Sequence, residues 1–229
     1  MHTAIAASVK AARAAANQGR GRPARWDGLA LTRRQARARD PAFVLALTGR
    51  DPFFGERSPL RDAIAGAQEL NVMLAHPAGA GLRRRVATQA RPTPLSSLQE
   101  EIGVCLEHLA DRRNRGGRVA LKFYEQEPFW KVIVLGDRLW VRDCHAAPGP
   151  WPEREYEFGG QPAVQAAHTP FFMHFLDRWN DSRSPEYDFD TGLLVYRDAA
   201  TGSVVRRATL ALPVREDARL APLRRRSAP

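Results

Sequence analysis

The stretch that decides the fold is Ala42-Phe43-Val44-Leu45-Ala46-Leu47-Thr48-Gly49. A short, continuous apolar run that ends at glycine is typical of a buried β-strand. A loop over 50–55 and a helix over 59–68 are predicted next, followed by a second strand over 71–75. Because so compact a strand–helix–strand unit favours two parallel strands, the sequence predicts an α/β fold.

Hydrophobic spacing continues this pattern along the chain. Apolar residues at helical spacing predict three further helices, over 81–89, 95–112 and 171–180. Alternating or continuous apolar runs predict strands over 118–124, 129–135, 139–144, 156–158, 193–196 and 204–212. The runs on either side of Gly136-Asp137 have the spacing of a hairpin, as do the last two of the chain.

Composition divides the chain into four segments. They are a basic Ala/Arg-rich N-terminal arm (1–40), an α/β domain (41–185), a C-terminal β-hairpin packed on that domain (186–214) and a basic tail (215–229). The arm and the tail contain few large apolar residues, so neither is expected to fold independently. The central domain is predicted to be a mixed sheet flanked by helices.

The formal net charge is +10, and nearly all of the positive charge is arginine, since the three lysines are Lys10, Lys122 and Lys131. A GC-rich gene would produce the bias toward arginine. The excess of positive charge is also typical of proteins that bind a polyanion, either nucleic acid or an anionic membrane surface. Both interpretations stay open at this stage.

Several classes of protein are not expected. No apolar run reaches 18 residues, which argues against a membrane-spanning helix, and the start of the chain does not resemble a secretory signal. Two cysteines, Cys105 and Cys144, do not make a disulfide framework, so we expect a reducing compartment such as a bacterial cytoplasm. Phosphate-loop, dinucleotide-binding and serine-elbow motifs are missing, and no cofactor is expected. Paired Cys and His residues give weak support for a metal.

From Ala42 to Trp179 the order of predicted elements resembles one half of a phospholipase D-type enzyme. In that superfamily, two paired strands carry the motif H-x-K-x-x-x-x-D. The corresponding stretch here is Phe129-Trp130-Lys131-Val132-Ile133-Val134-Leu135-Gly136-Asp137, followed by a second apolar strand. The resemblance implies a single phospholipase D-like half, and it also implies a homodimer, because related enzymes with one motif per chain act as dimers.

The chain departs from this motif at the residues that carry the chemistry. In the family the histidine attacks phosphorus and forms a covalent intermediate. Here Phe129 stands in its place, Gly136 holds the aspartate position, and Asp137 comes one residue late. None of the six histidines is followed two residues later by lysine. Lys131 keeps its position, which the resemblance assigns to phosphate contact; alternatively, it is a strand residue that extends its ammonium group to water.

Further candidates for a phosphate or nucleic-acid site lie around this hairpin. Arg142 and His145 are near the end of its second strand, and His145 could act as a relocated nucleophile or base, or be an ordinary loop histidine. Lys122 and Tyr124 alternate along an earlier strand and are expected to face the same cleft as Lys131. The other candidates are Arg50, which follows the first strand and could instead cap a helix or pair with Asp51, and Trp130, which could stack on a base.

Three functions are consistent with these residues. The favoured one is a non-catalytic phospholipase D-like domain that binds a phosphate-bearing ligand or nucleic acid in a regulatory or sensing role. The second is a phosphodiesterase, a nuclease or phospholipase-like enzyme that would use His145, Lys131 and Asp137. The third is an interaction scaffold that contacts a protein partner through its basic arms.

Overall fold

A mixed sheet of ten strands runs through the part of the chain described by this computed structural model, which covers residues 22–23, 41–54, 60–88, 93–127, 129–136, 138–143, 155–159 and 162–212. The strands are arranged in the order β1-β7-β6-β5-β2-β3-β4-β8-β9-β10. Their bounds are Arg22–Pro23 (β1), Ala42–Ala46 (β2), Glu69–Ala75 (β3), Arg118–Tyr124 (β4), Trp130–Leu135 (β5), Arg138–Asp143 (β6), Glu155–Gly159 (β7), Glu186–Asp188 (β8), Leu193–Arg197 (β9) and Val204–Thr209 (β10). The predicted α/β class with a mixed sheet is therefore confirmed.

Three parallel strands form the centre of this sheet. β2 pairs in parallel with β3, and β3 pairs in parallel with β4, as the compact strand–helix–strand pattern predicts. Val44 and Val72 lie side by side in this centre and are fully buried. A strand that is covered on both faces needs apolar residues at nearly every position, which explains the continuous apolar run that opens the domain.

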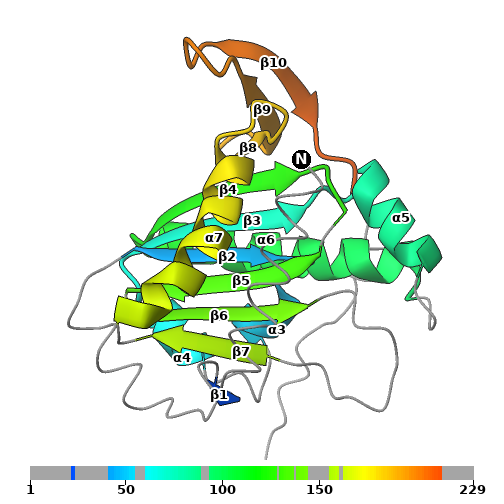
Figure 1. The fold of residues 1–229 in the computed structure, drawn as a ribbon. Helices are drawn as coiled ribbons and strands as arrows, with labels where there is room; N and C mark the ends of the chain where they lie inside the picture. Colours follow the sequence, from blue (N-terminus) through cyan, green and yellow to red (C-terminus); the bar gives the residue numbers. More distant parts are fainter. Residues whose placement is uncertain are drawn as a thin grey trace, which may run out of the picture.

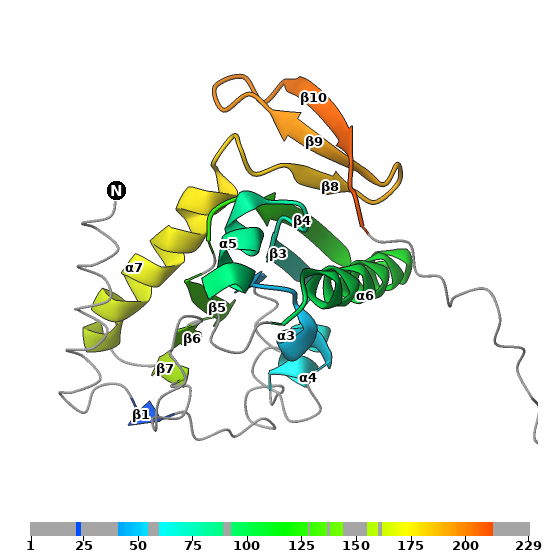
Figure 2. The ribbon, with the colours of Figure 1, turned by 90° about the vertical axis from the view of Figure 1, so that its right-hand side faces the viewer.

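Helices cover both faces of the sheet. α7 (Pro162–Trp179) lies on one face, while α3 (Arg50–Phe54), α4 (Arg61–Gly66) and α6 (Leu95–Asn114) lie on the other (Figures 1 and 2). α5 (Ala80–Thr88) follows β3. Phe43 of β2 shows how α7 is attached, because its ring makes edge contacts with Phe172 and Phe175 at centroid distances of 5.1 and 5.4 Å. The two covered faces make one continuous hydrophobic core.

Antiparallel strands extend the parallel centre on one side. β5 pairs with β2, β6 pairs with β5 in the predicted hairpin, and β7 pairs with β6. Gly136 in the hairpin turn has a φ of +58°, a conformation that glycine adopts without strain. Two residues of the N-terminal arm, Arg22 and Pro23, form β1 and pair with β7. The remainder of the arm and the basic tail lie outside the described residues.

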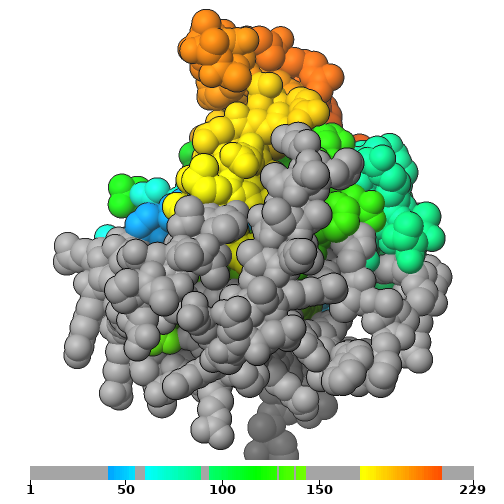
Figure 3. Space-filling model, in the orientation of Figure 1, coloured from blue at the N-terminus to red at the C-terminus, as the bar shows by residue number. Residues whose placement is uncertain are grey.

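On the other side, the sheet is extended by β8, β9 and β10 (Figure 2). The predicted terminal hairpin corresponds to β9 and β10, and β8, which was not predicted, links it to β4. This hairpin stands at the upper end of the molecule in Figure 3. Its outer strand carries Arg206 and Arg207 and has an irregular register between Val204 and Arg206. Charge and irregularity of this kind protect a sheet edge from pairing with other chains.

Two segments differ most from the structure that the sequence predicts. The stretch predicted as a loop over 50–55 contains α3, because Phe53 donates a backbone hydrogen bond to the carbonyl of Gly49 and the chain coils immediately after β2. α7 begins at Pro162, nine residues before the predicted start at Phe171, since its first half lacks the aromatic spacing that marks its second half. No helix among the described residues is both long and apolar enough to cross a membrane.

Candidate functional site

The turn after β2 brings several polar groups to the carboxyl end of the parallel strands. Gly49 has a φ of +80°, and a Cβ atom at this position would lie 2.5 Å from Sγ of Cys105. The turn therefore requires glycine for two reasons: other residues rarely adopt this φ, and a side chain would clash with Cys105. It ends directly in α3, so that Arg50 and Asp51 stand at the strand end where open α/β sheets usually bind ligands.

Lys131 and Asp51 form the central contact of this region. Nζ of Lys131 donates a hydrogen bond of 2.6 Å to Oδ2 of Asp51. The lysine side chain is 8% exposed, whereas the aspartate side chain is 47% exposed. Lys131 therefore does not extend its ammonium group into water. Its charge is buried and is balanced by a carboxylate that itself faces solvent.

Arg142 brings a second cation to the same carboxylate. It is paired directly with Lys131 across β5 and β6, and residues paired in this way point to the same face of a sheet. Its Nη1 lies 3.7 Å from Oδ2 of Asp51. Burial opposes ionisation of Asp51, but the charge and hydrogen bond of Lys131, together with the charge of Arg142, outweigh it and lower the pKa of this carboxyl. We call Asp51, Lys131 and Arg142 the β5 cluster.

A second ion pair lies beside the β5 cluster. Nη1 of Arg50 donates to Oε1 of Glu101 on α6 at 2.7 Å, and Oγ1 of Thr48 donates to Oε2 of the same residue at 2.8 Å. Arg50 thus pairs with Glu101 rather than with Asp51, its sequence neighbour. The arginine side chain is 70% exposed, so its outer surface remains accessible beside the buried Lys131.

Lys122 and Tyr124 do not share a cleft with Lys131, and this expectation from the sequence is wrong. The register aligns Lys122 with Met73, then with Leu45 and finally with Val132, so these four residues point to one face. Lys131 is the neighbour of Val132 along β5 and therefore points to the opposite face. Two strands, β2 and β3, also separate β4 from β5.

The contacts agree with this assignment. Nζ of Lys122 donates to the carbonyl oxygen of Trp179 at the end of α7 at 2.8 Å and lies 5.2 Å from that ring's centroid. The hydroxyl of Tyr124 donates to the carbonyl of Ala46 at 3.0 Å within the sheet. Trp130 is 8% exposed and makes an edge contact with Phe171 of α7, so it is a core residue in this structure and not an exposed platform for a base.

The face under α7 has a polar group of its own. Arg178 is only 9% exposed, and its Nη1 lies 2.8 Å from Nδ1 of His174. Its guanidinium lies over the ring of Tyr124, 5.9 Å from the centroid. Burial, and then the charge of Arg178, lower the pKa of His174 to about 3. A neutral His174 is therefore part of the folded protein at neutral pH.

Some of the predicted site residues cannot be placed. His145 and Asp137 lie outside the described residues, as does Cys144. Phe129, which the motif resemblance aligns with the nucleophilic histidine, is 36% exposed at the entrance to β5. Within the described ranges, no group of three or more His, Cys, Asp or Glu residues could hold a metal ion. Cys105 is buried beneath Gly49, and burial raises the pKa of its thiol.

The sequence reasoning missed the acidic half of this site. The sequence offers Asp51 only as a possible partner for Arg50, although Asp51 lies beyond the carboxyl end of the buried strand β2, where open α/β sheets usually bind ligands. The contacts of Glu101 with Thr48 and Arg50 could not be predicted from the sequence, because they depend on how α6 packs against the turn after β2.

No protein-family model and no curated protein matches this sequence. A partly exposed carboxylate that neutralises a buried ammonium and a neighbouring guanidinium can be replaced by another anion. The β5 cluster is thus suited to bind an anionic group.

Proposed function

We propose that this chain is a non-catalytic phospholipase D-like domain that binds a phosphate-bearing ligand at the β5 cluster. The observation that carries the proposal is the contact between the buried Lys131 ammonium and the half-exposed Asp51 carboxylate, with Arg142 beside them. Lys131 is also the residue for which the family resemblance implies phosphate contact. The proposal thus rests on two independent arguments that concern the same atom.

Exchange of anions is the physical basis of the proposed binding. A buried ammonium needs a counter-charge, and the carboxylate of Asp51 provides one. A phosphate group carries more negative charge than a carboxylate and has more acceptor oxygens, and the planar fork of Arg142 suits it. Because Asp51 is exposed on its outer side, it can swing away while a phosphate takes its place. The exposed Arg50 would then lie at the rim of the site.

The proposal also includes the absence of catalysis. The family's nucleophile position is occupied by Phe129, whose hydrocarbon ring cannot attack phosphorus. Incubation of the full-length protein with a generic phosphodiester, with and without divalent metals, is expected to give no turnover. Turnover that is abolished by His145→Ala would contradict this part of the proposal and would favour the phosphodiesterase.

The two lysines of the sheet provide a matched pair for the binding test. Lys131→Met is expected to weaken the binding of inorganic phosphate and of a mononucleotide at least tenfold, about 1.4 kcal/mol, in calorimetric titrations at low salt. Lys122→Met removes the same charge from the opposite face and is expected to leave binding unchanged. Equal weakening by both substitutions would mean that net charge rather than a site attracts the ligand. No measurable binding by the unmodified protein would refute the proposal.

A single-stranded oligonucleotide in the same titrations separates nucleic acid from a free nucleotide. A protein that neutralises several phosphates loses affinity steeply as salt increases. A steep dependence with the oligonucleotide, together with weak binding of the mononucleotide, would assign the site to nucleic acid. A shallow dependence for both would assign it to a single phosphate group.

Asp51→Asn tests the exchange directly. The substitution removes the charge of Asp51 from the buried Lys131, so we expect a loss of about 1 to 2 kcal/mol at pH 7, smaller than for a fully buried pair because Asp51 is half exposed. Added phosphate is expected to restore more stability to the variant than to the unmodified protein. Since the pKa of Asp51 is lowered by folding, the difference between the two proteins is present at neutral pH. It is expected to disappear as acid protonates the carboxylate. Thermal unfolding with and without phosphate measures both effects.

A further inference from the structure

The turn between β9 and β10 projects from the body of the protein and carries apolar side chains (Figures 1 and 3). Ala199 and Ala200 in this turn are exposed. Val204 and Val205 at the start of β10 are 41% and 63% exposed. A single exposed apolar side chain is ordinary, but two large ones side by side at the end of a projecting hairpin are not. We call these four residues the hairpin tip.

A β-bulge keeps Val205 at the surface. Val204 is paired with Arg197, and Arg206 is paired with Tyr196, the preceding residue of β9, so Val205 is an extra residue in this register. In a regular ladder, Val205 would lie opposite Tyr196 and cover its ring. Instead, the guanidinium of Arg206 lies over that ring, 3.9 Å from the centroid. Because bulges redirect side chains and are built features of a sheet, the exposed valine calls for a reason.

The backbone of the turn satisfies its hydrogen bonds internally. Asp198 is the only acidic residue between positions 197 and 212 of the sequence. Its Oδ1 accepts hydrogen bonds from the backbone N–H groups of Ala200 and Thr201 at 3.1 and 2.8 Å, and from the hydroxyl of Thr201 at 2.9 Å. N–H groups that already have a partner cost less to move out of water than unpaired ones do. The turn is thus suited to a less polar environment.

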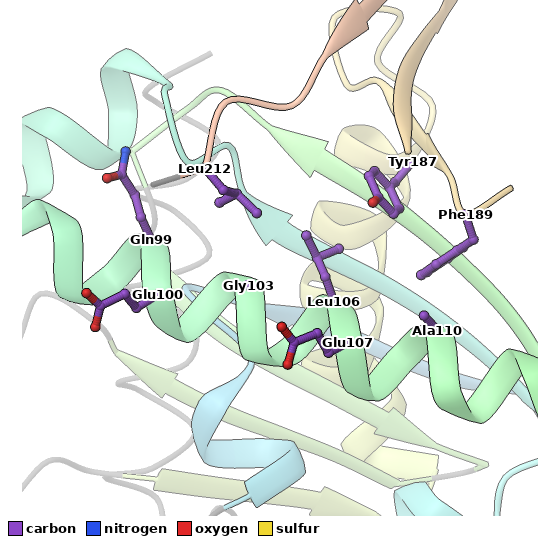
Figure 4. Close-up of a pocket in the computed structure, with 9 residues that line it drawn as sticks. All are labelled: Gln99, Glu100, Gly103, Leu106, Glu107, Ala110, Tyr187, Phe189 and Leu212. Atoms are coloured by element: carbon purple, nitrogen blue, oxygen red, sulfur yellow. The ribbon is translucent and has the colours of Figure 1, made fainter. Parts of the chain in front are cut away.

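The base of the hairpin is fixed to the body of the protein. Tyr187 of β8 and Phe189 lie across a groove of about 340 Å³ from Leu106 of α6 (Figure 4). Nη1 and Nη2 of Arg113 on α6 donate to the two carboxylate oxygens of Asp190 at 2.6 and 2.8 Å. A bidentate contact of this kind fixes orientation as well as distance. The hairpin tip is therefore presented on a fixed support.

Along β10, the apolar residues come first and the cations follow. Val204 and Val205 lie next to the turn, and Arg206 and Arg207, which are also exposed, come next toward the body. Two steps along a strand cover about 7 Å, so the valines extend about that far beyond the arginines. At a bilayer surface, apolar groups enter the boundary between headgroups and acyl chains, while cations contact the phosphates above it. A nucleic acid would instead favour cations at the outermost position.

We propose that the hairpin tip enters the surface of a bilayer that contains anionic lipid. The apolar side chains of the tip lie at the boundary of the acyl chains, and Arg206 and Arg207 contact the lipid phosphates. The formal net charge of +10 attracts the whole chain to such a surface. The residues that make this contact lie outside the β5 cluster. The inference therefore goes beyond the proposed function and does not depend on it.

Co-sedimentation with vesicles tests the proposal. Full-length protein is mixed with vesicles of phosphatidylcholine alone, or of an equal mixture of phosphatidylcholine and phosphatidylserine. We expect binding to the mixed vesicles, and binding to phosphatidylcholine that is weaker by about tenfold or more. No binding to the mixed vesicles at low salt would refute the proposal. Equal binding to both kinds of vesicle would contradict the requirement for anionic lipid.

Substitutions in β10 separate the apolar contact from the ionic one. Val204→Ser combined with Val205→Ser is expected to weaken binding to the mixed vesicles by about fivefold or more, at low and high salt alike. Arg206→Gln combined with Arg207→Gln is expected to weaken it by about tenfold or more at low salt and by less at high salt. Both pairs of residues are exposed, so these variants should fold normally.

Matched controls remove similar groups elsewhere. Met173 on α7 is 46% exposed, and Met173→Ser is expected to leave vesicle binding unchanged. Arg61→Gln combined with Arg118→Gln lowers the net charge by the same amount as the two substitutions in β10. Because these two exposed arginines pair with Asp62 and Glu69, away from the hairpin tip, we expect binding to weaken by less than about threefold.

A fluorophore on the tip reports its surroundings directly. Ala199→Cys in a Cys144→Ser background is labelled with an environment-sensitive dye, and the buried Cys105 is protected from labelling. We expect the emission to shift to shorter wavelength when mixed vesicles are added. Binding without such a shift would mean that the tip stays in water, which contradicts the proposal.

Each other pattern overturns the proposal in a defined way. Weakening by the arginine substitutions but not by the valine substitutions would indicate attraction to the surface without entry of the tip. Binding that is lost in Lys131→Met but kept in the β10 variants would place a lipid headgroup at the β5 cluster, which supports the proposed function alone. An oligonucleotide, but not vesicles, bound through Arg206 and Arg207 would assign the hairpin to nucleic acid. A dimer that is lost with the valine substitutions would assign it to a second copy of the chain.

Discussion

Gly49→Ala is expected to lower the free energy of unfolding by about 3 kcal/mol, although it adds a single methyl group. Two costs combine. At a φ of +80°, an alanine is strained by about 1 kcal/mol, and its Cβ would lie 2.5 Å from Sγ of Cys105. Neither Cys105 nor the turn can shift easily to make room, since Cys105 is fully buried and Phe53 packs against the same glycine. Denaturant unfolding of the two proteins measures the loss.

Gly202→Ala is the control that separates these costs. Gly202 also has a positive φ, +68°, but an added Cβ there would meet no atom within 4 Å. We expect a loss of about 1 kcal/mol, from conformation alone. In addition, Cys105→Ala should be less harmful in the Gly49→Ala background than alone, because it removes the clashing sulfur. Equal losses from both glycine substitutions would show that the turn after β2 tolerates a side chain.

The second large effect concerns pH. Between pH 7 and about pH 4.5 the protein is expected to lose about 2 kcal/mol of stability through His174 alone. Folding lowers the pKa of this histidine to about 3, because of burial and then the charge of Arg178, so the folded state excludes a proton that the unfolded state binds below about pH 6.5. Stability therefore falls as the pH falls through this window. The loss stops near pH 3, where the folded form is protonated as well.

His174→Gln isolates this effect from other titrating groups. Glutamine is polar and of similar length, but it carries no charge at any pH. The unmodified protein and the variant are unfolded by denaturant at several pH values, and the difference between their stabilities is plotted against pH. We expect this difference to change by about 1.4 kcal/mol for each pH unit below pH 6. A difference that does not depend on pH would mean that His174 binds a proton as readily in the folded as in the unfolded state, so that burial and the charge of Arg178 do not lower its pKa.

The elements of this fold were largely predictable from the sequence, because they depend on local spacing. The alternation over 118–124 matches β4, and the two apolar runs on either side of Gly136 match β5 and β6. Where local spacing is weak, the prediction was wrong. Five residues after Gly49 form α3 instead of a loop, and this short helix depends on a turn that packs against Cys105.

The composition of the site was less predictable, because it depends on long-range register. β5 lies beside β2, although more than 80 residues separate them in the chain. A shift of this pairing by one residue would move Lys131 to the face of Lys122, and nothing in either strand alone excludes it. Similarly, a motif resemblance in the sequence singles out Lys131, whereas its partner Asp51 becomes evident only from the packed turn.

The contact between Gly49 and Cys105 also gives the protein an internal reporter. Alkylating reagents attack thiolates that solvent can reach, and the Cys105 thiol is both buried and held protonated. It therefore reacts only in molecules in which α6 has moved away from the turn after β2. In a Cys144→Ser background, the rate of alkylation measures the fraction of molecules in this open state. Alkylation of Cys105 thus reports how often α6 separates from the turn after β2. A ligand that binds at the neighbouring β5 cluster is expected to slow this alkylation.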